Sequence, residues 1–141
     1  MTYGKHVFLV TMLAGFSAVA VRAADLKVIA NPSVTADSVS AEDLKNVFLA
    51  TKTSLSDGSH VEPVLEKGGP AHEAFLKAYI GKTDAALETY YRSLVFTGKG
   101  SMPKAMATDA EVVAYIAKTK GAIGYVAAAT AVAGVKTLEV K

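Results

Sequence analysis

The residues best suited to binding a ligand form a glycine-rich turn, Gly68-Gly69-Pro70-Ala71-His72, which follows a short apolar run. Pro70 suits the first turn of a helix, where its missing N–H loses no hydrogen bond. The first N–H groups of a helix have no acceptor inside the helix, and the helix dipole favours negative charge beside them. We therefore expect Gly68, Gly69, Ala71 and His72 to bind a small oxyanion, with the backbone N–H groups of Gly69, Ala71 and His72 pointing at it.

The same turn also has a purely structural interpretation, in which the two glycines only reverse the chain before a helix. His72 lies in the first turn of that helix. Its imidazole could add a contact to an anion, but the protonated ring is disfavoured beside the positive end of a helix. The sequence therefore favours a solvent-exposed His72 side chain.

Two other groups of residues are weaker candidates for ligand binding. Residues 97–101 (Thr-Gly-Lys-Gly-Ser) carry hydroxyls, glycines and a lysine, but they lack the Gly-x-x-x-x-Gly-Lys-Ser/Thr spacing of a phosphate-binding loop. A flexible surface loop is the simpler interpretation. His60 is expected to be exposed, and it is far from His72 in sequence, so a metal site helped by Glu62 and Glu66 has little support.

Enzymatic arrangements find little support in the sequence. There is no Gly-x-Ser-x-Gly motif, and the absence of cysteine excludes disulfides, thiolate catalysis and cysteine-based zinc sites. The pair Glu42-Asp43 lies at an expected helix start, where acidic residues favour the dipole. The pair Tyr90-Tyr91 fits core and rim packing. We predict a protein that is not an enzyme and has no cofactor.

The N-terminal residues 1–23 have the features of a secretory signal. Lys5 precedes an uncharged apolar run over residues 7–21, and Val21 and Ala23 place small residues at the −3 and −1 positions of a cleavage site. The run is shorter than the roughly 20 residues that span a bilayer, although an uncleaved membrane anchor is the rival interpretation. We expect cleavage after Ala23 and one domain over residues 24–141, released into a bacterial periplasm without further membrane contact.

The charges of this expected mature chain balance. Removing Lys5 and Arg22 leaves 13 basic residues against 13 acidic ones. No basic tract remains that would indicate nucleic-acid binding.

Apolar runs and helix caps alternate along the chain. Ser40 with Asp43 and Thr108 with Glu111 have the spacing of capping boxes, and Thr83 is a third expected cap. Gly81 is expected to end the helix that Pro70 opens, and a polar loop is expected over residues 97–107. Strands are expected over residues 26–30, 61–65, 122–126 and 135–140. This alternation predicts a single α/β layer domain.

Several short runs resemble the phosphate-type periplasmic substrate-binding proteins of ABC transporters. Nearly all of the chain after residue 25 is covered by this resemblance, which corresponds to one lobe of a family that normally has two. The runs are Asp43-Leu44, Val47-Phe48-Leu49, Asp57-Gly58, Pro63-Val64, Phe96-Thr97-Gly98-Lys99-Gly100, Pro103-Lys104 and Gly121-Ala122-Ile123-Gly124-Tyr125-Val126.

The resemblance implies a single lobe of a type-II periplasmic binding protein, with a mixed, largely parallel sheet flanked by helices. It also implies binding of phosphate or a similar oxyanion in connection with phosphate ABC transport. In two-lobe members the matching turn reads Gly-Ser-Gly-Thr, and the ligand-binding hydroxyls of that turn are missing here. The alternative is a periplasmic protein-interaction or accessory module that has lost ligand binding. For the interaction module a protein partner is expected. If the anion is bound tightly, a homodimer whose glycine turns share a cleft would supply the second wall.

Overall fold

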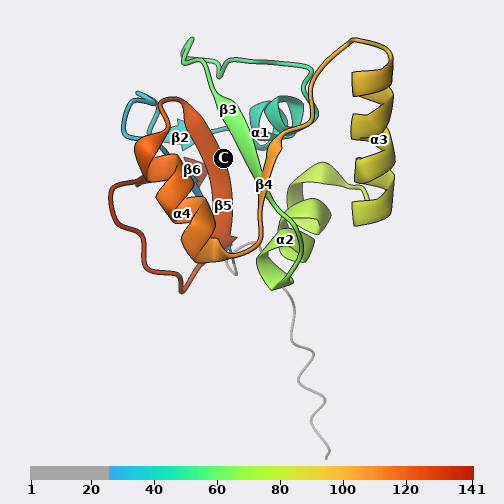
Figure 1. Cartoon of the computed structure of the whole chain (residues 1–141). Helices are drawn as coiled ribbons and strands as arrows, with labels where there is room; N and C mark the ends of the chain where they lie inside the picture. Colours follow the sequence, from blue (N-terminus) through green and yellow to red (C-terminus); the bar gives the residue numbers. More distant parts are fainter. Residues whose placement is uncertain (1–25) are drawn as a thin grey trace, which may run out of the picture.

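The computed structural model describes residues 26–141 of the chain (Figure 1). The expected signal over residues 1–23 and its cleavage site therefore lie outside the described residues. Within residues 26–141, no helix has the length and apolar character needed to cross a membrane.

A six-stranded mixed sheet organises the described part of the chain, in the order β2-β6-β1-β5-β3-β4. β1 runs antiparallel to its neighbours β5 and β6, whereas β2 with β6, β3 with β5 and β3 with β4 are parallel pairs. The mixed, largely parallel sheet expected from the sequence is confirmed. The strands are β1 (Leu26–Ala30), β2 (Ser38–Val39), β3 (Glu62–Glu66), β4 (Lys104–Met106), β5 (Ala122–Ala127) and β6 (Lys136–Val140).

The helices begin where the sequence places their caps. The hydroxyl groups of Ser40, Thr83 and Thr108 accept hydrogen bonds from backbone N–H groups three residues later, at 3.0, 3.2 and 3.2 Å. Pro70 opens α2, which continues into a π-helical turn, η2, and Gly81 ends that turn with φ 72°. The helices are α1 (Ala41–Phe48), α2 (Pro70–Phe75), η2 (Leu76–Ile80), α3 (Asp84–Phe96) and α4 (Asp109–Lys118).

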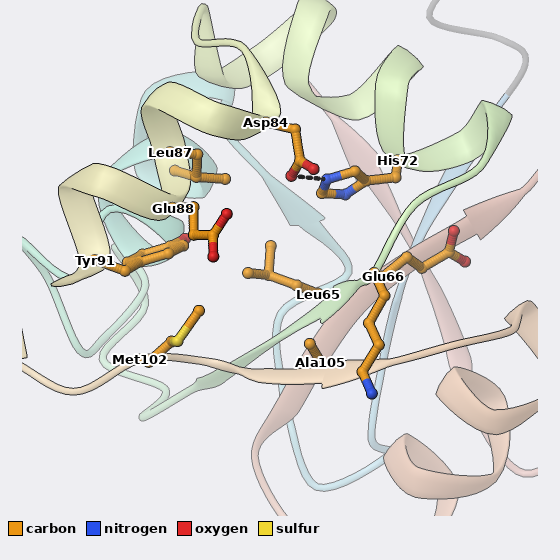
Figure 2. A pocket seen from close by; sticks show the side chains of 10 residues that line it. Leu65, Glu66, His72, Asp84, Leu87, Glu88, Tyr91, Met102 and Ala105 are labelled. Carbon is orange, nitrogen blue, oxygen red and sulfur yellow. Dashed lines mark hydrogen bonds and ion pairs between the residues drawn. The ribbon is translucent and has the colours of Figure 1, made fainter.

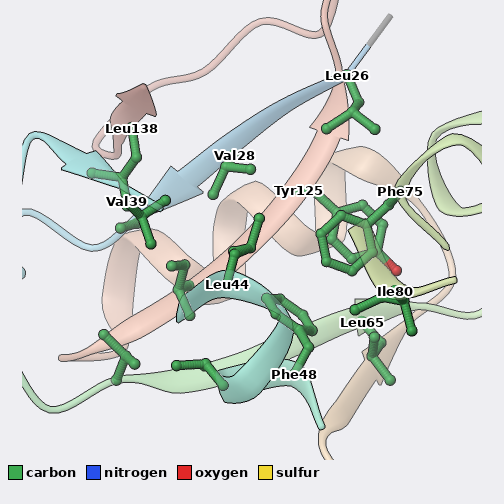
Figure 3. Close-up of a cluster of buried hydrophobic side chains, with 14 of the residues drawn as sticks. Leu26, Val28, Val39, Leu44, Phe48, Leu65, Phe75, Ile80, Tyr125 and Leu138 are labelled. Carbon is green, nitrogen blue, oxygen red and sulfur yellow. The ribbon is translucent and has the colours of Figure 1, made fainter. Parts of the chain in front are cut away.

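The two faces of the sheet carry different amounts of core. α4 alone covers one face, over a small cluster that includes Val64 and Ile116. The other face carries α1 and α2 over a larger cluster (Figure 3), where Phe75 stacks on Tyr125 with ring centroids 3.9 Å apart. α3 lies beyond the edge of the sheet and buries only Leu87 and Tyr91 (Figure 1).

The expected loop over residues 97–107 is only partly a loop. Its last residues form β4, whose Lys104 pairs with Val64 of β3. A three-residue strand carries no alternation pattern of its own, and it forms here because β3 offers a free edge. The two-residue strand β2, which pairs with β6, was also not expected, because it is too short to show an alternation pattern.

Candidate anion-binding site

The glycine turn lies between the end of β3 and the start of α2, as expected. Gly69 is the N-cap residue with φ 97°, a backbone conformation that favours glycine, and no side chain caps this helix start. Gly68, Gly69 and Pro70 are exposed, whereas Ala71 and His72 are buried. The turn thus exposes its first three residues, and no side chain caps the helix start that follows.

The expectation of a solvent-exposed His72 is wrong, because its side chain is only 2% exposed. The Nδ1 atom lies 2.5 Å from the hydroxyl of Tyr125, and Nε2 lies 2.9 Å from the Oδ1 atom of Asp84 (Figure 2). The Tyr125 hydroxyl accepts a hydrogen bond from the backbone N–H of Glu66, so its own proton is free to go to Nδ1. Nε2 then carries the proton and donates it to Asp84. Both ring nitrogens are occupied within the protein.

Burial of the His72 ring follows from its position on α2. The residue shares the apolar face of the helix with Phe75 and Leu76, three and four positions later, and both of these are buried. This spacing was the signal in the sequence that pointed to burial. The ring is stable there because its two polar atoms find partners, from β5 and from the start of α3.

A cavity of about 280 Å³ lies beside the turn, between the β3–β4 edge and α3. Asp84 and Glu88 bring carboxylates to it, and Lys67, the residue that precedes the turn, also lines it. Figure 2 shows the carboxyl group of Glu66 pointing away from the cavity. The complete lining is Leu65, Glu66, Lys67, His72, Asp84, Leu87, Glu88, Tyr91, Met102 and Ala105.

Glu66 is a buried carboxyl group beside a second carboxyl group. Burial, together with the hydrogen bond to Asp109 and the negative charge there, raises the pKa of Glu66 to about 8. The same hydrogen bond holds the pKa of Asp109 below its usual value, and Asp109 also accepts from Thr130 Oγ1 at 2.6 Å and from Ala127 N at 3.1 Å. At neutral pH, Glu66 is therefore protonated and adds little negative charge near the turn.

The structure also places the weaker candidates from the sequence. His60 is exposed, as expected, and it does not line the cavity that contains His72. Among residues 26–141, no group of three or more His, Asp or Glu side chains is arranged to hold a metal ion. The Tyr90 and Tyr91 hydroxyls donate to the backbone carbonyls of Leu49 and Phe48, so this pair packs as expected.

Comparison with known proteins finds similar structures but no similar sequences among family models and curated proteins. A Clostridium perfringens protein described as a phosphate ABC transporter substrate-binding protein, solved with bound phosphate, superposes with a TM-score of 0.64 and 13% identity, over 82% of this chain and 44% of that one. PstS from Borrelia burgdorferi gives a TM-score of 0.60 and 13% identity, over 83% and 47%. An ABC-type phosphate transport receptor from Vibrio cholerae gives 0.52 and 12%, over 82% and 46%.

These likenesses confirm the resemblance at the level of the fold. The chain spans less than half the length of each of these proteins. The Clostridium perfringens and Vibrio cholerae proteins are described as a binding protein and a receptor of phosphate transport. The described residues build their sheet and helices in the arrangement that those proteins share, at an identity too low to carry over a ligand. The chain has the fold of about half of a phosphate ABC transporter substrate-binding protein.

Proposed function

We propose that this chain is a periplasmic, non-enzymatic protein that binds phosphate or a similar small oxyanion at the glycine turn, in connection with phosphate transport. The observation that carries the proposal is the uncapped start of α2, where Gly69 adopts a positive φ and Gly68 and Gly69 are exposed. A strand that delivers a glycine turn to a helix start is a frequent anion site in proteins. Two of the structural neighbours are described as phosphate-transport proteins, which supports the same ligand class.

The residues of the turn have separate roles in this proposal. Gly68 and Gly69 let the anion approach the backbone, and the N–H groups of Gly69, Ala71 and His72 donate to its oxygens. The imidazole of His72 does not touch the anion, because Tyr125 and Asp84 occupy its nitrogens. Its role is to anchor the first turn of α2. The exposed ammonium of Lys67 adds a favourable charge.

The affinity of this site for inorganic phosphate is expected to be modest. The turn is exposed, and interactions between charges weaken strongly where water surrounds them. A few backbone donors must also offset the loss of translational and rotational freedom on binding. We expect a dissociation constant of about 1 mM, which corresponds to roughly −4 kcal/mol.

A titration followed by NMR tests the proposal. Adding phosphate or sulfate should shift the amide signals of Gly68, Gly69 and Ala71, and Lys67→Gln should weaken binding. Lys77→Gln, which changes another exposed lysine, is the matched control and should bind as the unchanged protein does. Absence of shifts at the turn with tens of millimolar phosphate would reject this function.

The second candidate is a protein-interaction module, and one observation favours it. Among residues 26–141, the strongly exposed large apolar side chains lie at the end of α3 and in the loop that follows: Val95 at 53%, Phe96 at 93% and Met102 at 51%. Apolar side chains gathered on a surface often mark a contact with another protein. A partner or a second copy of the chain would cover Phe96.

Light scattering, together with pull-down from a periplasmic extract, separates the two functions. For the interaction module, Phe96→Ser should abolish self-association or partner capture and leave the NMR shifts with phosphate unchanged. A monomer that captures no partner and binds phosphate in a saturable way would favour the first function.

A further inference from the structure

A second cavity, of about 340 Å³, lies at the opposite end of the parallel strands from the glycine turn. The register pairs Glu62 of β3 with Ala122 of β5, and Val64 of β3 with Lys104 of β4. The segments that lead into these three strands therefore meet at one end of the sheet (Figure 1). Together with the chain that follows α1, they form the walls of this cavity.

Lysines from three separate segments line it. Lys52 follows α1, Lys104 begins β4 and Lys120 precedes β5, and Glu62 is the only carboxylate of the lining. Among residues 26–141, neither Lys104 nor Lys120 has an ion-pair partner. The cavity therefore carries a net positive charge.

Lys52 is held in place by a buried carboxylate. Its Nζ atom lies 3.0 Å from the Oδ1 atom of Asp43, a residue only 5% exposed. The Oδ2 atom of Asp43 accepts from the backbone N–H of Ser56 at 3.1 Å and from the Ser56 hydroxyl. Lys52 is thus paired with a carboxylate, so Lys104 and Lys120 carry the uncompensated charge of this cavity.

The backbone around the cavity is tied together by hydrogen bonds. The N–H of Glu62 donates to the carbonyl of Gly121 at 2.8 Å, and the N–H of Val61 donates to the carbonyl of Thr53 at 3.0 Å. Gly121 has φ 75°, and a Cβ atom there would lie 3.0 Å from the carbonyl oxygen of His60. Glycine at this position lets the two segments approach, so the cavity is formed before any ligand arrives.

We propose that this cavity binds an organic anion, with a phosphate or similar dianionic head beside Lys104 and Lys120 and a short apolar body against Val47, Val61 and Met102. The volume falls within the range of roughly 300–1,000 Å³ that is typical of small-molecule sites, and it exceeds what inorganic phosphate needs. Apolar walls with a few polar groups that fix orientation are also typical of such sites. The inference stands independently of the glycine-turn site.

Phenyl phosphate is the probe, and inorganic phosphate and phenol are its two halves. Titration of the protein, followed by NMR, should shift the amide signals of Thr53, Lys104 and Lys120. The binding of phenyl phosphate should be at least tenfold tighter than that of either half, and added NaCl should weaken it. The double variant Lys104→Gln/Lys120→Gln should lose at least tenfold in affinity.

Two variants distinguish this site from the glycine turn. Lys118→Gln changes an exposed lysine of α4 that does not line the cavity, and Lys67→Gln changes the turn. Lys118→Gln should bind phenyl phosphate with unchanged affinity, whereas Lys67→Gln should weaken only the shifts at residues 68–72. Thermal unfolding of each variant confirms that the fold is intact.

The inference is overturned by any of three results. Shifts confined to residues 68–72 would place the anion at the turn instead. An unchanged affinity in the folded double variant would show that the lysines do not bind it. Equal affinities for phenol and phenyl phosphate would show that the cavity binds only the apolar ring and not the phosphate head.

Discussion

The two cavities lie toward different ends of β3, share Met102 in their linings and differ in charge. The cavity beside the glycine turn lies next to the carboxyl end of β3, where ligands of open α/β sheets are usually found, and it is lined by Asp84 and Glu88. The cavity at the amino ends of the strands carries Lys52, Lys104 and Lys120. The favourable backbone geometry and the favourable side-chain charge for an anion are therefore in different places. The glycine motif predicts where backbone N–H donors lie, but it does not predict the charges of the side chains that surround them.

The largest effect that we expect is a pH dependence that comes from Glu66, at the turn end of β3. Its pKa is raised from 4.5 to about 8, so the folded state holds a proton that the unfolded chain has lost between these values. The free energy of unfolding should therefore fall as the pH rises from 4.5 to 8, by on the order of 5 kcal/mol, and should level off above pH 8. Urea denaturation at pH 5 to 9 measures this slope.

Glu66→Gln sharpens that measurement. An uncharged amide can still donate to Asp109, so the slope should disappear. Glu62→Gln is the control at the other cavity, because the Glu62 side chain is exposed, and it should retain the slope of the unchanged protein. An unchanged slope in Glu66→Gln would show that another group is responsible.

The second prediction concerns the anchor of the glycine turn. His72→Ala removes a buried ring and leaves the Tyr125 hydroxyl without one partner, so the free energy of unfolding should fall by about 3 kcal/mol. His60→Ala, at an exposed residue that lines the lysine cavity, should change it by less than about 0.5 kcal/mol. Equal effects in the two variants would contradict the different environments of the two histidines.

A third prediction tests the wall of the lysine cavity. Gly121→Ala should destabilise the fold by about 2 kcal/mol, because it combines a positive φ with the close approach to His60. Gly98→Ala is the matched control, since Gly98 has φ 68° but nothing within 4 Å of the added Cβ. The free energy of unfolding of Gly98→Ala should fall by only about 1 kcal/mol. Urea denaturation of both variants measures how much the contact between the added Cβ and the His60 carbonyl oxygen contributes. A similar loss of unfolding free energy in the two variants would show that this contact has no effect.

The smallest effect that we expect is on the affinity for inorganic phosphate, in variants of one lysine at each end of the sheet. Lys67→Gln should weaken phosphate binding at the turn by about threefold, since one exposed charge contributes roughly 0.5 to 1 kcal/mol. Lys104→Gln should leave the NMR shifts at Gly68 and Gly69 unchanged. If the two variants lose affinity for phosphate equally, Lys67 and Lys104 would contribute to a single phosphate site, and the two ends of the sheet would not bind anions separately.

The sequence by itself determined the local features of this protein. Each cap, at Ser40, Thr83 and Thr108, depends on a side chain and a backbone group three residues away. Gly69 and Gly81 adopt positive φ angles that glycine permits at helix ends. The alternation of strands and helices followed from these short-range signals, and so did the α/β fold class.

Only the tertiary structure decided how the sites are built. β4 exists because β3 offers an edge, and His72 is buried because Tyr125 and Asp84, 53 and 12 positions away in sequence, meet its two nitrogens. Lys104 and Lys120 line one cavity because the parallel register brings the starts of β3, β4 and β5 together. Charges that are separated in sequence act jointly only where the chain folds them side by side, since their interaction depends on distance in space.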